Sequence, residues 1–325
     1  MKLPRRKFLH LAAGAVALPA LSHVARAQVY PTRPVTVLVF VPAGGTPDIV
    51  ARLIGQTLSQ RLGQSMIIDN RPGASGNLAL QAAARAPADG YTLLQVATPH
   101  AVNVSLHEKS PVNVMRDIEP IASTNYDSFV MLVHPSFQAK TIPELVAYAK
   151  ANPGKINLGS SGTAAMSHLS AELFRMNTGI DWVHVPFRGT PAAHSALLAG
   201  DVQVMFDAVG SSISHIQAGS LRAIGVSATT RMRVLPDVPS ISDFVPGYEV
   251  TAWLGYGAPK GTPAEIVERL NREINAVIAD PTINARLIEI GSTPLAGSRA
   301  DFAKLVADDV EKWSRVVKFA GLKVD

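Results

Sequence analysis

The chain has 325 residues, of which 47% are apolar, contains no cysteine and carries a formal charge of +5. The lack of cysteine excludes disulfides, thiolate metal sites and a lipoprotein attachment site. Five basic residues and no acidic residue lie in residues 1–27, so the rest of the chain is neutral, which argues against a nucleic-acid-binding surface.

Residues 1–27 read as a targeting segment. Arg5-Arg6 precede an apolar run from Phe8 to Leu21, and Ala25-Arg26-Ala27 has the pattern of a cleavage site. The paired arginines resemble a twin-arginine export signal. Because the apolar run is too short for a membrane anchor, we expect export to the periplasm, with Gln28 as the first residue of the mature protein.

The stretch Val35–Asp48 predicts a strand, a glycine turn and the start of a helix. Apolar and β-branched residues run up to Pro42, as in a buried parallel strand. The pair Gly44-Gly45 permits a tight turn with uncovered peptide N–H groups. Thr46 suits the N-cap and Pro47 the first helical position. This arrangement favours a small anion such as a carboxylate, although an ordinary strand-to-helix turn has the same pattern.

Strands and helices alternate through the remaining chain. We expect strands at 65–69, 91–96, 129–135, 156–158, 182–185, 202–206, 221–226 and 252–258, and helices at 78–85, 142–151, 192–199, 263–279, 282–291 and 301–320. A further helix should begin near Met166. This alternation predicts an α/β fold with a parallel sheet, whose binding crevice lies at the carboxyl ends of the strands.

A second copy of the strand, turn and helix device follows further along the chain. Gly159–Thr163 forms its turn, and Asp207 ends another strand beside Gly210-Ser211-Ser212. The chain crosses outward near Ser123–Ser128 and returns near Thr251–Gly257. We therefore expect two domains, one formed by residues 28–125 and 253–325 and the other by residues 126–252.

Several motifs in a fixed order resemble the Bug/TctC family, the periplasmic solute-binding receptors of tripartite tricarboxylate transporters. They include PAGGTPDIVAR (42–52), DNRPGASGN (69–77), HVPFRG (184–189), MFD (205–207) and LPDVPS (235–240). The resemblance implies a two-domain Venus flytrap of the periplasmic-binding-protein type. It also implies a carboxylate-bearing ligand, held in the interdomain cleft largely by backbone N–H groups and water, and membrane transporter subunits as partners.

The candidate ligand-binding residues come from both domains. The resemblance implies Pro42, Ala43, Gly44, Gly45 and Asp48 in a first loop, Ser160, Ser161, Gly162 and Thr163 in a second, and Asp207. Positions near the predicted cleft add Phe40, His100 and Arg188. Two departures from the family pattern concern the loops: Ala164-Ala165 stands where the family often has a glycine and a hydroxyl residue, and Thr46-Pro47 is in reversed order.

Other classes of function have weaker support. The chain has no G-x-S-x-G, H-E-x-x-H, P-loop or G-x-G-x-x-G motif, and its histidines show no metal-ligand spacing. We expect no catalytic residue, no cofactor, no metal and a monomer. A receptor without a transporter, which presents its liganded form to a membrane sensor, remains an alternative.

Overall fold

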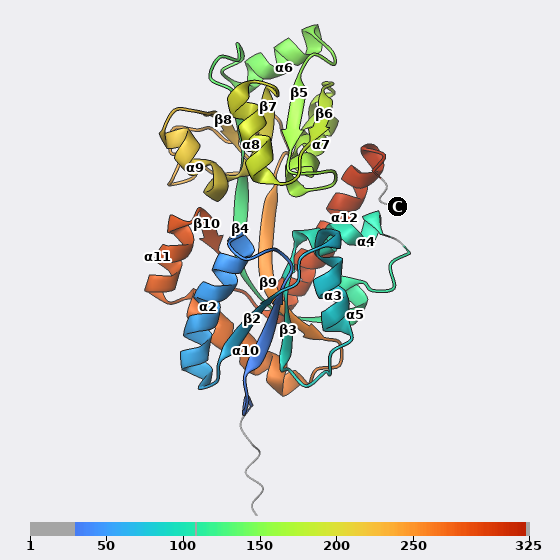
Figure 1. Cartoon of the computed structure of the whole chain (residues 1–325), viewed down its shortest axis with the longest axis vertical. Helices are drawn as coiled ribbons and strands as arrows, with labels where there is room; N and C mark the ends of the chain where they lie inside the picture. The colour runs from blue at the N-terminus through green and yellow to red at the C-terminus, as the bar shows by residue number, and fades with distance from the viewer. Residues whose placement is uncertain (1–29, 108, 323–325) are drawn as a thin grey trace, which may run out of the picture.

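The computed structural model describes residues 30–107 and 109–322 (Figure 1). The predicted export signal lies outside these residues and stays a prediction. Within them, no helix is both long and apolar enough to cross a membrane.

The described strands form one mixed sheet in the order β2-β1-β3-β9-β4-β7-β5-β6, with β8 and β10 each paired to β4. The strands are β1 (Val35–Val39), β2 (Met66–Asn70), β3 (Thr92–Ala97), β4 (Ile118–Val133), β5 (Asn157–Ser160), β6 (Val183–Pro186), β7 (Val204–Ala208), β8 (Arg222–Val226), β9 (Thr251–Pro259) and β10 (Ser292–Pro294). The predicted α/β architecture is confirmed, and the long antiparallel pair β4 and β9 divides the sheet into two parallel halves.

The two halves belong to two lobes, one above the other in Figure 1. The first lobe carries α2 (Thr46–Leu62), η1 (Ala74–Gly76), α3 (Asn77–Ala84), α4 (Thr98–Leu106), α5 (Val114–Asp117), α10 (Ala264–Ile278), α11 (Pro281–Glu289) and α12 (Arg299–Phe319). The second lobe carries α6 (Ile142–Ala151), α7 (Met166–Thr178), α8 (Thr190–Ala199), α9 (Val209–Gln217) and η2 (Ile241–Asp243).

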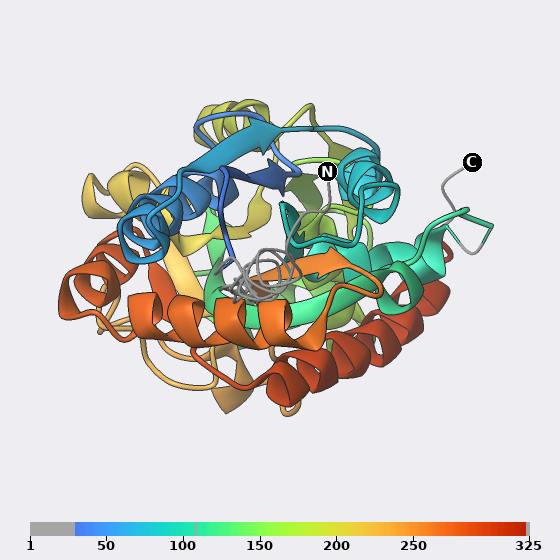
Figure 2. The same cartoon turned by 90° about the horizontal axis from the view of Figure 1, so that it is seen from below.

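Each half of the sheet is buried on both faces, as parallel strands require. In the first lobe one core joins β1 to α2, α10 and α11, and a second joins β3 to α3, α4 and α12. In the second lobe one core lies under α6 and α7 and another under α8 and α9. The view from below shows helices on both sides of the first-lobe strands (Figure 2).

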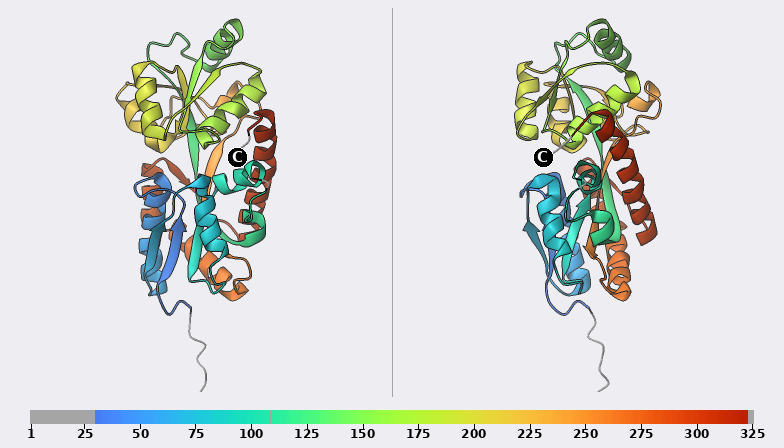
Figure 3. Two further views of the ribbon diagram at one scale, coloured as in Figure 1. Left: turned by 45° about the vertical axis from the view of Figure 1, so that its right-hand side comes forward. Right: turned by 90° about the vertical axis from the view of Figure 1, so that its right-hand side faces the viewer.

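Three elements connect the lobes. Strand β4 pairs with β9 up to Ser128 and with β7 and β8 from Phe129 onward. Helix α12 runs along the outside of the first lobe and reaches α7 of the second, where Trp313 enters the second-lobe core (Figure 3). The indole N–H of Trp253 on β9 donates to Asp309 Oδ2 on α12 at 2.5 Å, which ties the return strand to this helix.

The structure differs from the sequence expectations at several element ends. Strand β1 stops at Val39, so Phe40 and Val41 leave the ladder. Gly45 is the N-cap of α2, with extended angles of φ −71 and ψ 155, so the expected N-cap Thr46 is already helical. Helices α4 and α9 were not expected, because each is short and follows a strand without a polar loop.

Candidate functional site

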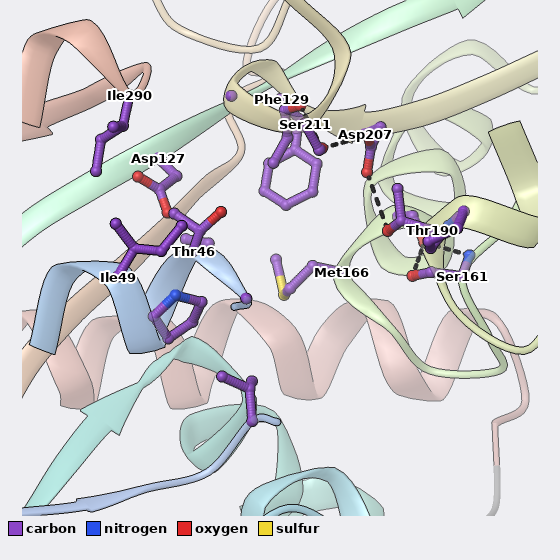
Figure 4. A pocket seen from close by; sticks show the side chains of 18 of the residues that line it. Thr46, Ile49, Asp127, Phe129, Ser161, Met166, Thr190, Asp207, Ser211 and Ile290 are labelled. Carbon is purple, nitrogen blue, oxygen red and sulfur yellow. Dashed lines mark hydrogen bonds between the residues drawn. The ribbon is translucent and has the colours of Figure 1, made fainter. Parts of the chain in front are cut away.

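A cavity of about 1030 Å³ lies between the lobes (Figure 4). The first lobe contributes Phe40, Gly44, Gly45, Thr46, Pro47, Ile49 and Ile290, the second contributes Ser161, Met166, Thr190, His194, Asp207, Ser211 and His215, and the connecting strands contribute Asp127, Phe129 and Trp253. Both lobes therefore wall the same space.

The first turn is held from below by Asp48. Its carboxylate accepts the Gly44 N–H at 2.9 Å, Arg52 Nε at 3.0 Å and Asn70 Nδ2 at 2.9 Å. Burial acts to raise the pKa of Asp48, but the hydrogen bonds from Arg52, Gly44 and Asn70 outweigh it and hold the pKa below its usual value. Asp48 is 2% exposed and does not line the cavity, so it acts as an anchor of the turn.

The glycine N–H groups of this turn are used within the turn itself. Gly44 donates to Asp48, and the Gly45 N–H donates to the Pro42 carbonyl at 3.3 Å. The first helical bond of α2 runs from the Ile49 N–H to the Gly45 carbonyl. The N–H groups of Thr46 and Asp48 are therefore the donors that the first turn leaves without an intrahelical partner.

The second turn is held by two histidines. His184 Nε2 lies 2.6 Å from Ser160 Oγ, and the Ala164 N–H donates to His168 Nδ1 at 3.1 Å. The two imidazole rings stack with centroids 3.6 Å apart. Burial and the neighbouring His168 lower the pKa of His184 to about 4, so its ring is neutral at physiological pH.

Two serines bring this turn to the cavity wall. The Ser161 N–H donates to Ser167 Oγ at 2.9 Å, and the two hydroxyls lie 2.8 Å apart. Both residues line the cavity, whereas Ser160 is fully buried beneath them.

The carboxylate of Asp207, at the end of β7, forms hydrogen bonds with side chains of α8 and α9. Its Oδ2 atom lies 2.5 Å from Ser211 Oγ, 2.8 Å from Ser212 Oγ and 2.9 Å from His194 Nε2. Its Oδ1 atom lies 3.5 Å from Thr190 Oγ1, and Figure 4 shows the bonds to Ser211 and Thr190. Asp207 lines the cavity as predicted, but protein donors already occupy its carboxylate.

The remaining candidates lie outside the cavity wall. His100 is fully buried behind Phe40, with ring centroids 5.2 Å apart, and burial lowers its pKa to about 4. Residues Pro42, Ala43, Gly162, Thr163 and Arg188 do not line the cavity. Of the predicted set, the structure brings together Phe40, Gly44, Gly45, Ser161 and Asp207.

Helix N-termini supply backbone donors to the cavity, beside the carboxylates of Asp127, Asp207 and Glu289. First-turn residues of five helices line the cavity: Thr46 of α2, Pro99 of α4, Met166 of α7, Thr190 of α8 and Gly210 of α9. Helix N-termini present unpaired N–H groups and the positive end of the helix dipole. Among the described residues no lysine or arginine lines the cavity. The arrangement suits an anion bound by neutral donors.

Sequence reasoning missed Asp127, His194, Thr190 and Met166. The polar run Ser123–Ser128 inside an otherwise apolar strand was the available signal for Asp127, because a strand that crosses an open cleft exposes polar side chains. In the part of the chain that the structure describes, no three histidine or acidic side chains gather as a metal site would require.

Comparison with known proteins gives consistent results. Residues 50–322 match the family model described as tripartite tricarboxylate transporter family receptor, TctC. The protein BugT of Bordetella pertussis is 31% identical over 95% of this chain and 96% of its own length.

Solved structures resemble the chain over a similar extent. The R. palustris protein Rpa4515, solved with adipate, is 35% identical with a TM-score of 0.82, over 91% of this chain and 100% of that one. MatC from Rhodopseudomonas palustris, solved with bound malate, is 32% identical with a TM-score of 0.78, over 89% of this chain and 100% of that one.

Proposed function

Because this chain belongs to the TctC family of tripartite tricarboxylate transporter receptors, we propose that it captures a small organic carboxylate in the cavity between its lobes. Members of this family are periplasmic solute-binding proteins and not enzymes, as the sequence resemblance predicted. We further propose that the liganded protein, a monomer, delivers its solute to the membrane subunits of a tripartite tricarboxylate-type transporter.

The observation that carries the carboxylate proposal is the convergence of five helix N-termini on a cavity that no lysine or arginine lines, within the described residues. A carboxylate there would accept hydrogen bonds from the first-turn N–H groups of α2 and α7 and from the Ser161 hydroxyl. The adipate and malate bound to two similar proteins support a carboxylate as the ligand class.

We also propose that residues 28–125 with 253–325 and residues 126–252 are domains that close on the ligand. The change of partners of β4 at Ser128 and Phe129 supports this division. Closure would let donors of both turns contact one anion, so the liganded state would favour the closed form. Small-angle scattering should then give a smaller radius of gyration with ligand than without it.

A thermal-shift screen of organic acids tests the binding proposal. A ligand that binds only the folded state adds about 2.7 kcal/mol at a hundred times its dissociation constant, so at least one carboxylate should raise the melting temperature by several degrees. If a broad acid library shifts nothing while a neutral sugar or a metal ion does, the proposal is wrong.

A matched pair of variants at Thr46 tests the donor itself. Thr46→Pro removes one N–H group at the first helical position, where proline is well accepted, and the preceding Gly45 is already extended. Thr46→Ala keeps that N–H and removes the hydroxyl and the γ-methyl group of the side chain. We expect Thr46→Pro to weaken carboxylate binding about tenfold or more, with Thr46→Ala close to the unmodified protein. Equal affinity in the two variants would place the anion elsewhere.

A further inference from the structure

Asp127 stands at the hinge end of the cavity. It lies on β4 between Ala252 of β9 and Ser292 of β10. Because side chains alternate along a strand, Asn125, Asp127 and Phe129 share one face, and both Asp127 and Phe129 line the cavity. Figure 4 shows the Asp127 side chain in the same wall as Thr46, Ile49 and Ile290.

Only one oxygen of the Asp127 carboxylate is engaged by the described protein. Oδ1 accepts the Ser292 hydroxyl and Asn125 Nδ2, the latter at 3.2 Å. Oδ2 has no hydrogen-bond partner among the described residues. A carboxylate oxygen that faces a cavity with its acceptor sites free is positioned to bind a donor from a ligand.

The other two carboxylates that line the cavity differ from Asp127. Asp207 receives donors from α8 and α9 on both of its oxygens. Glu289 is 61% exposed at the rim and pairs with Arg286 at 2.9 Å. Among the described residues that line the cavity, Asp127 is therefore the carboxylate with a free inward-facing acceptor.

The position of Asp127 is unfavourable for the empty protein. Burial raises the pKa of Asp127 to about 6, and the bonds from Ser292 and Asn125 only partly oppose this effect. A partly buried carboxylate without a counter-charge reduces folding stability, and perturbed acids of this kind concentrate at functional sites. A ligand that carries a positive group would supply the missing partner.

We propose that Asp127 is a specificity-determining residue that binds an ammonium group of the solute, so that the preferred ligands are aminocarboxylates. This inference rests on the proposed function, because the carboxylate end would still be held by the helix N-termini. The absence of lysine and arginine from the described cavity wall supports it, since a second ligand carboxylate beside Asp127 would meet a like charge without a counter-charge.

Isothermal titration calorimetry on the unmodified protein at neutral pH tests this preference. For several chain lengths, a monocarboxylate is compared with its α-amino derivative, its terminal amino derivative and the matching dicarboxylate; valerate, norvaline, δ-aminovalerate and glutarate form one such set. At least one amino derivative should bind about tenfold or more tightly than its parent acid and the matching dicarboxylate, as a charge-assisted hydrogen bond predicts.

Asp127→Asn then identifies the residue responsible. The amide oxygen can still accept from Ser292, so the variant should fold, and its melting temperature without ligand should rise because a partly buried charge without a counter-charge is removed. The variant should lose most of the preference for the amino derivative, and it should bind the monocarboxylate at least as tightly as the unmodified protein does because a negative charge has left the cavity. Glu289→Gln is the control, because it removes one negative charge from the cavity rim. This variant should still bind the amino derivative more tightly than the parent acid.

Two failures are distinguishable. If carboxylates bind but the amino derivatives gain nothing, or if Asp127→Asn keeps the preference, the role of Asp127 is overturned while the proposed function stands. If no carboxylate of any set binds, the proposed function fails and this inference fails with it.

Discussion

The two turns at the cavity have the same role in the fold, but different kinds of side chain fix their shape. In the first lobe, the turn at Gly44 is fixed by Asp48, an ionised carboxylate that Arg52 and Asn70 satisfy. In the second lobe, the turn at Ser161 is fixed by two stacked imidazole rings, because His184 contacts the Ser160 hydroxyl and His168 accepts the Ala164 N–H. The comparison shows that a strand, turn and helix device specifies a backbone shape and leaves open whether a carboxylate or imidazole rings hold it. The two turns should therefore respond differently to substitution and to pH.

The largest expected effect is at the charged anchor. Asp48→Ala leaves the Gly44 N–H and the Asn70 amide without their acceptor and leaves Arg52 without its ion pair, so we expect a loss of about 2–4 kcal/mol in the free energy of unfolding. Urea denaturation measures it. Asp69→Ala is the control, because Asp69 pairs with Arg71 at the surface, where such pairs contribute about 1 kcal/mol or less. Equal losses in both variants would show that the first turn does not depend on its buried carboxylate.

The second turn should be the more sensitive to acid. The pKa of His184 is about 4 in the folded protein against 6.5 for a free histidine, because burial and His168 disfavour its charged form. The unfolded chain therefore binds more protons between these values, so stability is full above pH 6.5 and falls as the pH drops toward 4. The depressed pKa of Asp48 acts in the same direction at lower pH: its contribution to stability is present above the usual carboxyl value and is lost only as the pH falls below it.

A substitution at His184 measures how much this side chain contributes to the loss of stability in acid. His184→Gln should reduce the stability lost between neutral pH and pH 4 by about 1–3 kcal/mol. His134→Gln is the control, because that ring bonds only Ser136 near the surface. His100 in the first lobe also has a pKa of about 4, so it adds a loss of stability in acid that His184→Gln does not remove. His184→Gln is therefore compared with His134→Gln as well as with the unmodified protein. An unchanged pH profile in His184→Gln would assign the acid loss to other groups.

Features that depend on neighbouring residues could be predicted from the sequence, whereas contacts between distant residues could not. A capping box opens α12, with the Asp301 N–H donating to Ser298 Oγ at 3.1 Å and the Ser298 N–H donating to Asp301 Oδ2 at 2.9 Å. Its atoms lie within one helical turn, so the sequence alone specifies it. The positions of both turns were predicted for the same reason, since glycine and proline act on their own backbone.

The rest of the site depends on contacts between distant segments. Asp127 meets Ser292, and His168 meets His184, only after the sheet has formed. His100 was expected at the cleft edge because of its place after β3, but α4 turns it into the core. The sequence also could not show that the Gly44 N–H, expected to face a ligand, is used by Asp48. Hydrogen-bond partners of this kind follow from tertiary packing, which no local pattern encodes.

The smallest expected effects compare the left-handed residues of the two turns. Gly44 has φ +87 and open space where a β-carbon would lie, so Gly44→Ala adds strain and no packing, with an expected loss of about 1 kcal/mol. Ala164 has φ +60 as a non-glycine residue, and its side chain is 9% exposed. Ala164→Gly relieves a strain of about 1–2 kcal/mol, but it removes a buried methyl group of about 0.8 kcal/mol and makes the unfolded chain more flexible by about 0.4–1 kcal/mol. These contributions nearly cancel, so urea denaturation should show a change below about 0.5 kcal/mol, against the clear loss in Gly44→Ala. A gain above about 1 kcal/mol would mean that the Ala164 methyl group contributes nothing to packing, and that hydrogen bonds such as the one to His168 hold the second turn in its strained shape.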